Sequence, residues 1–430
     1  SVMSQFLPAG FYYKTFMWPA SFWMTYEHFI RNAAGLGKVA SDPIDPERYE
    51  KTHRHCEILI AGGGAAGLMA AYQAALSGQR VMLVDEQAEF GGWLLSDDAV
   101  KIDNMPAYDW VREMQSLLSN MDNVTLLPRT TMFGYGDHNY ITLAERVTDH
   151  LSPRPSHLPR MRLWKVRAAQ VILATGCIER PLVFGGNDLP GVMLASAVQS
   201  YITQYGALPG SRAIIVTNND TAYQAALAFQ NAGGFVRAIV DTRTTVKGAW
   251  VKAAKDAGID ILSGHGLTGA YGIHHVGRVE ISPITADGRE ITGEALHMDC
   301  DLVMMLGGLT PTVHLHSQAR GKLVWDEKHL CFKPGATHEA EQSIGACNGS
   351  FALSSGLAEA IRAATKAVKS TGGTCTALSV PDVTALRINY APMAYWKAPS
   401  QAGAGQGPKA FVDFQNDVTS ADIQLAVREG

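Results

Sequence analysis

The sequence predicts an α/β protein with two domains, each a parallel sheet covered by helices, with the second domain inserted into the first. Three observations predict this. An apolar strand, a glycine-rich turn, a helix and a second strand follow one another between Cys56 and Asp85. A similar strand–helix–strand pattern recurs from Ser211 to Asp241. An apolar strand over Cys300–Leu306 then returns the chain to the first domain.

The first turn has the spacing G-x-G-x-x-G, carried by Gly62, Gly64 and Gly67. The first glycine permits a sharp turn, the second lets a pyrophosphate approach the backbone, and the third lets the helix pack closely. The helix begins at Ala65 and Ala66, where free N–H groups and the positive dipole end favour an anion. Strand, turn, helix and strand together therefore predict a Rossmann-like dinucleotide site. The alternative is a Rossmann-like unit that is kept for packing alone.

An acidic residue ends the second strand of this unit. Asp85, with Glu86 beside it, stands where a carboxylate accepts hydrogen bonds from both ribose hydroxyls and repels a 2′-phosphate. This favours NAD or FAD over NADP. Gly91 and Gly92 follow, and we expect this pair to support the far side of the cofactor, although a Gly-Gly pair alone is usually a turn.

Three later segments are expected beside the same cofactor. A buried strand over Arg167–Gly176 ends in Thr175-Gly176, whose small size permits close approach of the chain to a ligand. Glycines after the Cys300–Leu306 strand include Gly308, and a helix expected over Ser355–Ser370 begins near Gly356. We include Asn348, which precedes this helix, as a further cofactor-binding residue.

The second strand–helix–strand unit lacks the glycines. Thr217, Asn219 and Ala222 stand in their positions, and Asp241 ends the second strand. Side chains at these positions obstruct the close approach that a pyrophosphate requires. We therefore expect this domain to keep the Rossmann-like fold without conventional nucleotide binding.

Four regions complete the predicted organisation. The first 52 residues are rich in aromatic side chains that require cover from this chain or from another subunit. The last region is expected as a proline-bearing linker followed by a short helical segment that begins at a Thr419–Asp422 capping box. The predicted regions are 1–52 as the N-terminal segment, 53–205 with 300–372 as the split first domain, 206–299 as the inserted domain, and 373–430 as the C-terminal segment.

Composition excludes several classes of protein. A formal net charge of −4 without a Lys/Arg run argues against a nucleic-acid partner. The six cysteines are widely spaced and form no C-x-x-C pair, which fits a reducing cytoplasm without disulfides. The apolar Leu7–Met24 stretch is interrupted by Lys14 and Pro19, so we expect no membrane span. The start at Ser1 and the helical end predict a piece of a longer polypeptide.

No catalytic set stands out. The sequence shows no Ser/His/Asp arrangement, redox dithiol or acid–base pair. His314 and His316 have an H-x-H spacing, but no third ligand lies within sequence reach, so we predict no metal site. This absence fits a subunit that binds and orients cofactors while the chemistry happens largely on a partner.

Assembled, these motifs resemble the glutathione-reductase-like oxidoreductases with two dinucleotide-binding domains. More specifically, the chain resembles the α subunits of heterotetrameric sarcosine oxidases over nearly its whole length. The segments that carry this resemblance are LPAGFYYKTFMWP, SFWMTYEHFIRNAAGLGKV, AGGGAAGLMAA, VDEQAEFGGWLLS, LATGCIERPLVF, GGLTPTVHLHSQ, GACNGSFALSSG and KAFVDFQNDVTSADIQLAVREG. In the segment GACNGSFALSSG, flavoproteins often have an Asp at the position that Asn348 occupies here.

The resemblance implies an NAD site at Gly62, Gly64, Gly67 and Asp85. It implies β, γ and δ partner subunits, FAD on the β subunit, and FMN at the contact between α and β. Sarcosine is then oxidised on the β subunit, oxygen is reduced to hydrogen peroxide, and the one-carbon unit reaches tetrahydrofolate in a domain outside these residues.

Two alternatives stay open. The first is an α subunit of an opine, hydroxyproline or cyanide-forming dehydrogenase. In those relatives a cysteine-rich segment near the tail holds an iron–sulfur cluster, whereas Lys409–Asp413 here contains no thiolate. The second is a scaffold subunit whose Rossmann-like site holds no nucleotide.

Overall fold

The structure is a computed structural model that describes residues 19–33, 35, 45, 47–385, 390–400 and 407–429. The chain divides into two compact units, Ser1–Arg48 and Tyr49–Gly430. In the first unit, η2 (Ala20–Phe22) leads into α2 (Trp23–Ala33), a helix without a buried side chain. The aromatic residues expected from Phe6 to Trp18 lie outside the described residues.

The first sheet of the larger unit has the order β5-β2-β1-β8-β7-β6, with β21 also paired to β8. Strands β1, β2, β5, β8 and β21 run parallel, whereas β7 is antiparallel to both of its neighbours, β8 and β6. The strands are β1 (Tyr49–Ala61), β2 (Val81–Val84), β5 (Val124–Leu127), β6 (Thr130–Gly136), β7 (Tyr140–Arg146), β8 (Met161–Leu173) and β21 (Glu341–Ser343). Strand β8 starts earlier than the expected Arg167 because its first half pairs with β7.

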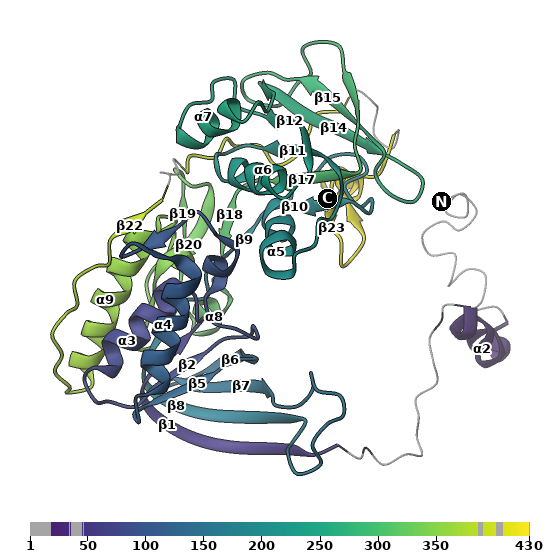
Figure 1. The fold of residues 1–430 in the computed structure, drawn as a ribbon. Helices are drawn as coiled ribbons and strands as arrows, with labels where there is room; N and C mark the ends of the chain where they lie inside the picture. The colour runs from purple at the N-terminus through teal and green to yellow at the C-terminus, as the bar shows by residue number, and fades with distance from the viewer. Residues whose placement is uncertain are drawn as a thin grey trace. The chain divides into compact units, whose positions relative to one another are not determined.

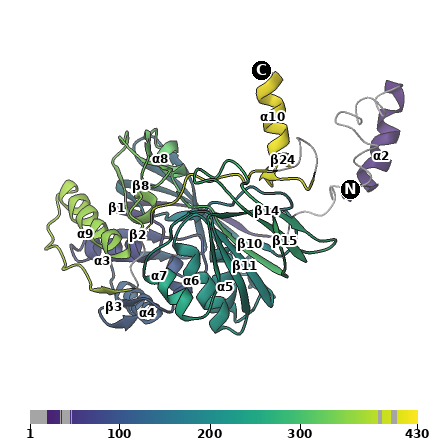
Figure 2. The ribbon, with the colours of Figure 1, turned by 90° about the horizontal axis from the view of Figure 1, so that it is seen from above.

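Three helices cover one face of this sheet: α3 (Ala65–Ala75), α4 (Ala107–Ser119) and α9 (Leu353–Ser370). Helices α3 and α9 lie side by side in both ribbon views (Figures 1 and 2). Their contact is close because the facing positions are mostly small, including Ala70, Ala74, Ala360 and Ala364, all fully buried. The apolar core between these helices and the sheet fixes where both helices begin.

The second sheet is parallel throughout, in the order β10-β17-β11-β12-β13. Helices cover one face and an antiparallel three-stranded sheet packs on the other. The parallel strands are β10 (Val192–Leu194), β11 (Arg212–Thr217), β12 (Phe235–Asp241), β13 (Ile261–Ser263) and β17 (Leu302–Leu306). The helices are α5 (Ala195–Tyr205), α6 (Thr221–Asn231) and α7 (Ala249–Asp256). The antiparallel strands are β14 (His265–Tyr271), β15 (Arg278–Pro283) and β16 (Leu296–Asp299).

These pairings correct the domain bounds expected from the sequence. The second domain was expected over 206–299, but β10 and β17 lie outside that range and belong to its sheet. Strand β17 is buried along its whole length, so it needs a neighbour on each edge, and β10 and β11 provide them. The first domain likewise begins at Tyr49 rather than at residue 53, since β1 pairs with β8 from that residue on.

Short elements connect the two domains and complete the first. Strand β9 (Cys177–Glu179) leaves the first domain and pairs with β18 (Leu309–Pro311), which returns to it. The remaining elements are β3 (Lys101–Ile102), β4 (Met105–Pro106), β19 (Leu323–Asp326), β20 (Cys331–Pro334), β22 (Val383–Thr384), η3 (Gly92–Ser96), η4 (Gly345–Asn348) and α8 (His314–Gln318).

The C-terminal segment is more than a linker. Tyr395 and Ala398 are buried against the second domain, and the Ala398 N–H donates to Val183 O at 2.8 Å. Two short strands, β23 (Phe411–Asp413) and β24 (Val418–Thr419), then precede α10 (Ser420–Glu429). The predicted capping box is confirmed, since the Thr419 hydroxyl and N–H both donate to Asp422 Oδ2 at 2.6 and 2.8 Å.

Candidate functional site

The glycine turn between β1 and α3 is shaped by two glycines that no larger residue can replace. Gly62 has a φ of +102°, and a Cβ atom there would lie 2.3 Å from Ala174 O. A Cβ atom on Gly67 would lie 1.8 Å from Gly62 O. Gly62 therefore makes the turn, and Gly67 lets the first turn of α3 lie directly against it.

Gly64 and the start of α3 form the open side of the turn. A Cβ atom on Gly64 would meet nothing within 4 Å, and this residue has extended backbone angles that any residue adopts. Gly64 is the N-cap of α3 and no side chain caps the helix, so N–H groups at Ala65 and Ala66 are available to a ligand. The geometry fits a pyrophosphate held by backbone donors.

Asp85 connects the end of β2 to the glycine turn. Its Oδ2 accepts the Gly63 N–H at 2.5 Å, and its Oδ1 accepts the Gln87 N–H at 2.7 Å. A carboxylate has about four acceptor positions, so Asp85 can hold the turn and still accept two ribose hydroxyls. Glu86 is exposed beside it.

The second glycine pair lies directly on the first turn. The Gly91 N–H donates to Gly63 O at 2.8 Å, and a Cβ atom on Gly92 would lie 3.2 Å from the Gly64 Cα. Both residues have positive φ, at +131° and +56°. The loop after β2 thus borders the open side of the turn.

The segment after β8 approaches the turn from another side. Ala174 touches Gly62, and the Thr175 hydroxyl donates to Thr312 O at 2.8 Å. Gly176 has a φ of +71°, and a Cβ atom there would meet nothing within 4 Å. Thr175 and Gly176 are therefore close to the turn, with open space beside Gly176.

The start of α9 adds a second uncapped helix N-terminus. Gly345, whose φ is +65°, bridges the two helices, because a Cβ atom there would lie 3.0 Å from the Ala66 Cβ and Gly356 packs against its Cα. No side chain caps α9. Two helix N-termini therefore border the same region, which increases its attraction for an anion.

Sequence reasoning missed Gly345 and Glu359 as members of the site. Glu359 Oε2 accepts the Gly345 N–H at 2.9 Å, and the Asn348 amide lies 3.5 Å from its Oε1. The expected Asn348 thus takes part in holding the bridging turn. Gly345 itself, three residues before Asn348, was the one sign of this turn in the sequence. Its hydrogen bond to Glu359 on α9 depends on tertiary packing, which the sequence does not show.

Gly308 lies in different surroundings from the other expected residues. Its φ is +127°, and a Cβ atom there would lie 2.4 Å from Arg180 Nη2 and 3.3 Å from the Tyr390 hydroxyl. Neither neighbour belongs to the glycine turn. The structure therefore places Gly308 at the β9–β18 connection between the domains.

The corresponding turn in the second domain is filled by its own side chains. Asn218 is fully buried and its amide donates to Gly307 O and Met393 O at 3.0 and 2.9 Å. Asp241, at the position that corresponds to Asp85, accepts two bonds from the Arg243 guanidinium, at 2.9 and 2.7 Å, and one from the Tyr223 hydroxyl at 2.7 Å. The side chains of Asn218 and Asp241 are thus engaged within the chain itself.

His316 does not have a free ring nitrogen. Its Nδ1 lies 2.6 Å from Glu341 Oε1 and its Nε2 lies 3.0 Å from Lys322 O, with both side chains fully buried. The described residues contain no group of three or more His, Cys, Asp or Glu side chains arranged for a metal ion. His316 is thus a structural link between α8 and β21.

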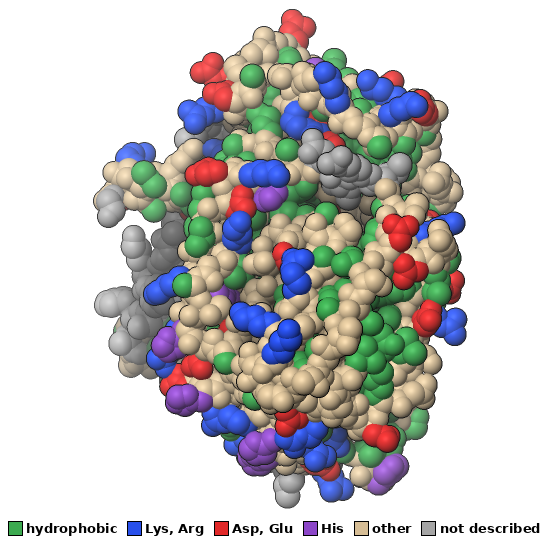
Figure 3. All heavy atoms as spheres, turned by 90° about the vertical axis from the view of Figure 1, so that its left-hand side faces the viewer, with side chains coloured by type: hydrophobic (Ala, Val, Ile, Leu, Met, Phe, Trp, Pro, Cys, Tyr) green, Lys and Arg blue, Asp and Glu red, His purple; other side chains and the backbone are tan. Residues whose placement is uncertain are grey.

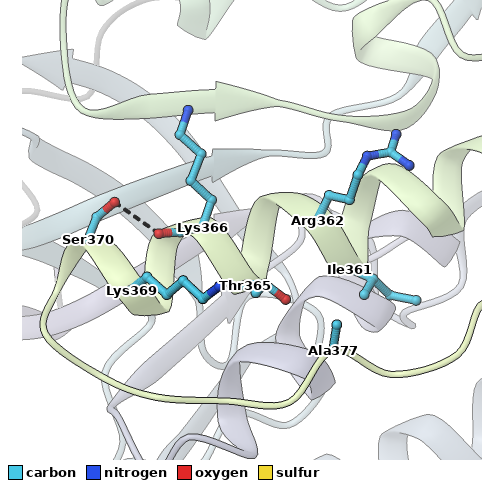
Figure 4. Close-up of a pocket in the computed structure, with 7 residues that line it drawn as sticks. All are labelled: Ile361, Arg362, Thr365, Lys366, Lys369, Ser370 and Ala377. Carbon is cyan, nitrogen blue, oxygen red and sulfur yellow. Dashed lines mark hydrogen bonds between the residues drawn. The ribbon is translucent and has the colours of Figure 1, made fainter.

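Two surface hollows lie away from the glycine turn. The larger, of about 560 Å³, runs along the outer side of α9, where Thr365 and Lys369 face Ala377 (Figure 4). Figure 3 shows the side of the molecule that lies at the left of Figure 1, where α9 lies, and several Lys and Arg side chains are exposed on it. The smaller, of about 360 Å³, is lined by His53, Arg54 and Arg80 at the opposite end of β1 from the turn. Neither hollow contains a residue expected for the cofactor site.

Glu179 gives the junction between the domains a pH-dependent stability. Its buried carboxyl accepts the N–H and the hydroxyl of Ser196 at 2.9 and 2.8 Å. Burial nevertheless raises the pKa of Glu179 from 4.5 to about 7. The folded state therefore holds more protons than the unfolded state between these values, so the Glu179 contribution to stability falls as pH rises through this window.

Replacing Glu179 with Gln is expected to remove this dependence. As the pH rises from 4.5 to 7, the wild type should lose roughly 3 kcal/mol in free energy of unfolding through the ionisation of Glu179, and the variant should not show this loss. Urea unfolding at both pH values measures the difference. Glu327→Gln, at an exposed position, is the matched control and should show the same loss as the wild type. An equal pH dependence in wild type and Glu179→Gln would contradict the assignment.

Among the described residues, none of the helices has the length and apolar character that crossing a bilayer requires. The six cysteines are all unpaired thiols. Burial raises the pKa of the Cys56 and Cys300 thiols to about 12, so both are protonated and unreactive at neutral pH.

Comparison with known proteins adds three findings. The family model of the pyridine nucleotide-disulphide oxidoreductases matches residues 56–331. Sarcosine oxidase subunit alpha of Rhizobium meliloti is 42% identical across 100% of this chain, and that of Corynebacterium sp. strain P-1 is 39% identical across 92%. The alignments cover 42% and 41% of those relatives, so the chain spans about two fifths of their length.

Among solved structures, an L-proline dehydrogenase from P. horikoshii has a similar fold. The TM-score is 0.59 at 17% identity, covering 91% of this chain and 69% of that one. At this identity the likeness concerns the fold alone.

Proposed function

The chain belongs to the pyridine nucleotide-disulphide oxidoreductase family. Within this family, we propose that it is the NAD-binding part of a sarcosine oxidase α subunit. Its identity to two such α subunits, across nearly all of this chain, supports the assignment. The single structural observation that carries it is the open side of the glycine turn, bordered by the uncapped starts of α3 and α9.

In this proposal the backbone around the turn binds the nucleotide. Gly62 and Gly67 set the shape, and the N–H groups of Ala65 and Ala66 hold the pyrophosphate beside Gly64. Asp85 accepts the ribose hydroxyls, with exposed Glu86 adding negative charge against a 2′-phosphate. The sides of the site are formed by residues from three other segments: Gly91, Gly92, Thr175, Gly176, Asn348 and Gly356.

The chain is proposed to hold one nucleotide. The second turn is occupied by Asn218 and by the Asp241–Arg243 pair, so only the first remains accessible. When bound, NAD supplies a hydride-accepting nicotinamide and two phosphates. This chain's own residues contribute binding and orientation, which fits the lack of a catalytic set among them.

The whole enzyme is proposed to act in the cytoplasm with β, γ and δ subunits. Sarcosine loses its methyl group by oxidation to give glycine, oxygen is reduced to hydrogen peroxide, and the one-carbon unit passes to tetrahydrofolate. FAD on the β subunit and FMN at its contact with this chain are the proposed flavins. Gly308, at the junction of the two domains, is kept as a proposed cofactor-binding position on that side.

Nucleotide extraction from the purified protein tests the proposal. We expect about one NAD per chain, because the family's turn and acid are both present. Finding no nucleotide would favour a scaffold subunit instead. Metal analysis of the assembly separates the other alternative, since the Lys409–Asp413 segment lacks the thiolates that an iron–sulfur cluster needs. Iron in stoichiometric amount would favour an opine-type or cyanide-forming dehydrogenase.

A further inference from the structure

Arg180 directly follows β9 and is only partly accessible to solvent. Its Nε and Nη2 donate to Gly307 O at 3.2 and 2.9 Å, and its Nη1 donates to Leu330 O at 3.0 Å. The guanidinium carbon lies 5.5 Å from the centroid of the Trp396 ring. The side chain is therefore held in one orientation by three separate segments of the chain.

The charge of this guanidinium is not balanced within the described part of the chain. Both of its hydrogen-bonding partners are carbonyl oxygens, and no described carboxylate lies within ion-pair distance. Burial lowers the pKa of Arg180, yet a guanidinium stays protonated at neutral pH. A partly desolvated cation without a counterion is costly, and an anionic ligand would relieve that cost.

Arg180 also has unused hydrogen-bonding capacity. A guanidinium has five N–H donors, and three are engaged here. The described residues provide no acceptor for the other two. Two N–H groups on neighbouring nitrogens match the spacing of two oxygens on a phosphate or a carboxylate.

The surroundings make room for the guanidinium and add a further donor. A Cβ atom at Gly308 would lie 2.4 Å from Arg180 Nη2, so glycine at this position leaves the space that the guanidinium occupies. The Tyr390 hydroxyl accepts the Leu309 N–H at 2.5 Å and keeps its own hydrogen to donate. The Tyr390 ring stacks on His329 with centroids 5.8 Å apart, which fixes its position. Trp396 is 41% exposed and Arg180 is partly exposed, whereas Tyr390 is buried, so a ligand would approach from the Trp396 side.

We propose that Arg180 and Tyr390 form an oxyanion-binding site, beside the Trp396 ring, for the phosphate or carboxylate group of a ligand. The site stands on these contacts alone and requires neither bound NAD nor a partner subunit. Its failure would consequently leave the proposed nucleotide site untouched. Phosphate and carboxylate share the required chemistry, and the test below distinguishes them.

The test is a fluorescence titration of the full chain with inorganic phosphate and, separately, acetate, at ionic strength kept constant with chloride. Trp396 reports binding because it touches the guanidinium, and Trp396→Phe identifies its share of the signal. We expect a saturable change in the wild type. Arg180→Gln should weaken binding at least about tenfold, which is the usual size of a charge-assisted hydrogen bond. Arg180→Lys should bind with intermediate affinity.

Arg167 offers a matched control. Its guanidinium also donates to two carbonyl oxygens, at 3.0 and 2.9 Å, and lies 5.0 Å from the Tyr140 ring centroid, but it is exposed. Arg167→Gln should therefore leave the titration unchanged. Tighter binding of phosphate than of acetate assigns a phosphate-bearing ligand, and the reverse assigns a carboxylate. A signal that never saturates, or one that is equal in Arg180→Gln, overturns the proposal.

Discussion

Replacing Gly64 with Val is expected to remove the nucleotide while leaving the chain folded. The backbone angles of Gly64 suit any residue, and a Cβ atom there would meet nothing within 4 Å. The new methyl groups would occupy the space that a pyrophosphate needs. Nucleotide content should fall from about one per chain to less than about a tenth. Extraction of bound nucleotide, together with circular dichroism and a urea unfolding curve, measures both effects.

Two further glycine variants make this result specific. Gly277 is exposed, and a Cβ atom there would meet only Tyr271 O at 3.9 Å, so Gly277→Val should keep both fold and nucleotide. Gly67→Val should fail to fold properly, because its Cβ would lie 1.8 Å from Gly62 O. A folded Gly64→Val protein with the nucleotide content of the wild type would show that the turn is not the binding site.

Local sequence patterns predicted the parts of the site that follow one another along the chain. The turn, the start of α3 and the acid after β2 depend on glycine spacing and on alternation between strand and helix, which are visible within about 30 residues. The pair Gly91 and Gly92 was expected beside the cofactor, whereas the bond from the Gly91 N–H to Gly63 O is seen only in the structure. In the structure Gly62, Gly67 and Asp85 make contacts within the turn, and Gly64 faces open space.

Tertiary pairing decided what the sequence could not predict. The register that brings β17 between β10 and β11 joins segments more than 80 residues apart. Burial of Asn218 beneath Met393 likewise depends on a distant segment that was expected to be a linker. The neighbours of Gly308, Arg180 and Tyr390, were not predicted either, because they come from segments that the sequence pattern does not connect with it. Hydrophobic pattern identifies a buried strand without identifying its neighbours.

Replacing Arg243 with Leu is expected to destabilise the second domain strongly. Arg243 Nη2 lies 2.7 Å from Asp241 Oδ2 and 2.8 Å from Asp220 Oδ1, and these two carboxylates are 0% and 2% exposed. Leucine would leave both carboxylates buried without a cationic partner, which costs about 3–5 kcal/mol in free energy of unfolding. Urea unfolding at neutral pH measures the loss.

The surface pair of Arg320 with Asp137 is the matched control, with side chains 58% and 65% exposed. Arg320→Leu should change the free energy of unfolding by less than about 1 kcal/mol. Adding Asp241→Asn and Asp220→Asn to Arg243→Leu should recover part of the loss, because the orphaned charges are then removed. If Arg243→Leu were no more harmful than Arg320→Leu, the network would not be holding the second domain together. Folded Arg243→Leu protein should still retain NAD, because the proposed nucleotide site uses Asp85 at the end of β2, and Asp241 at the end of β12 is not part of it.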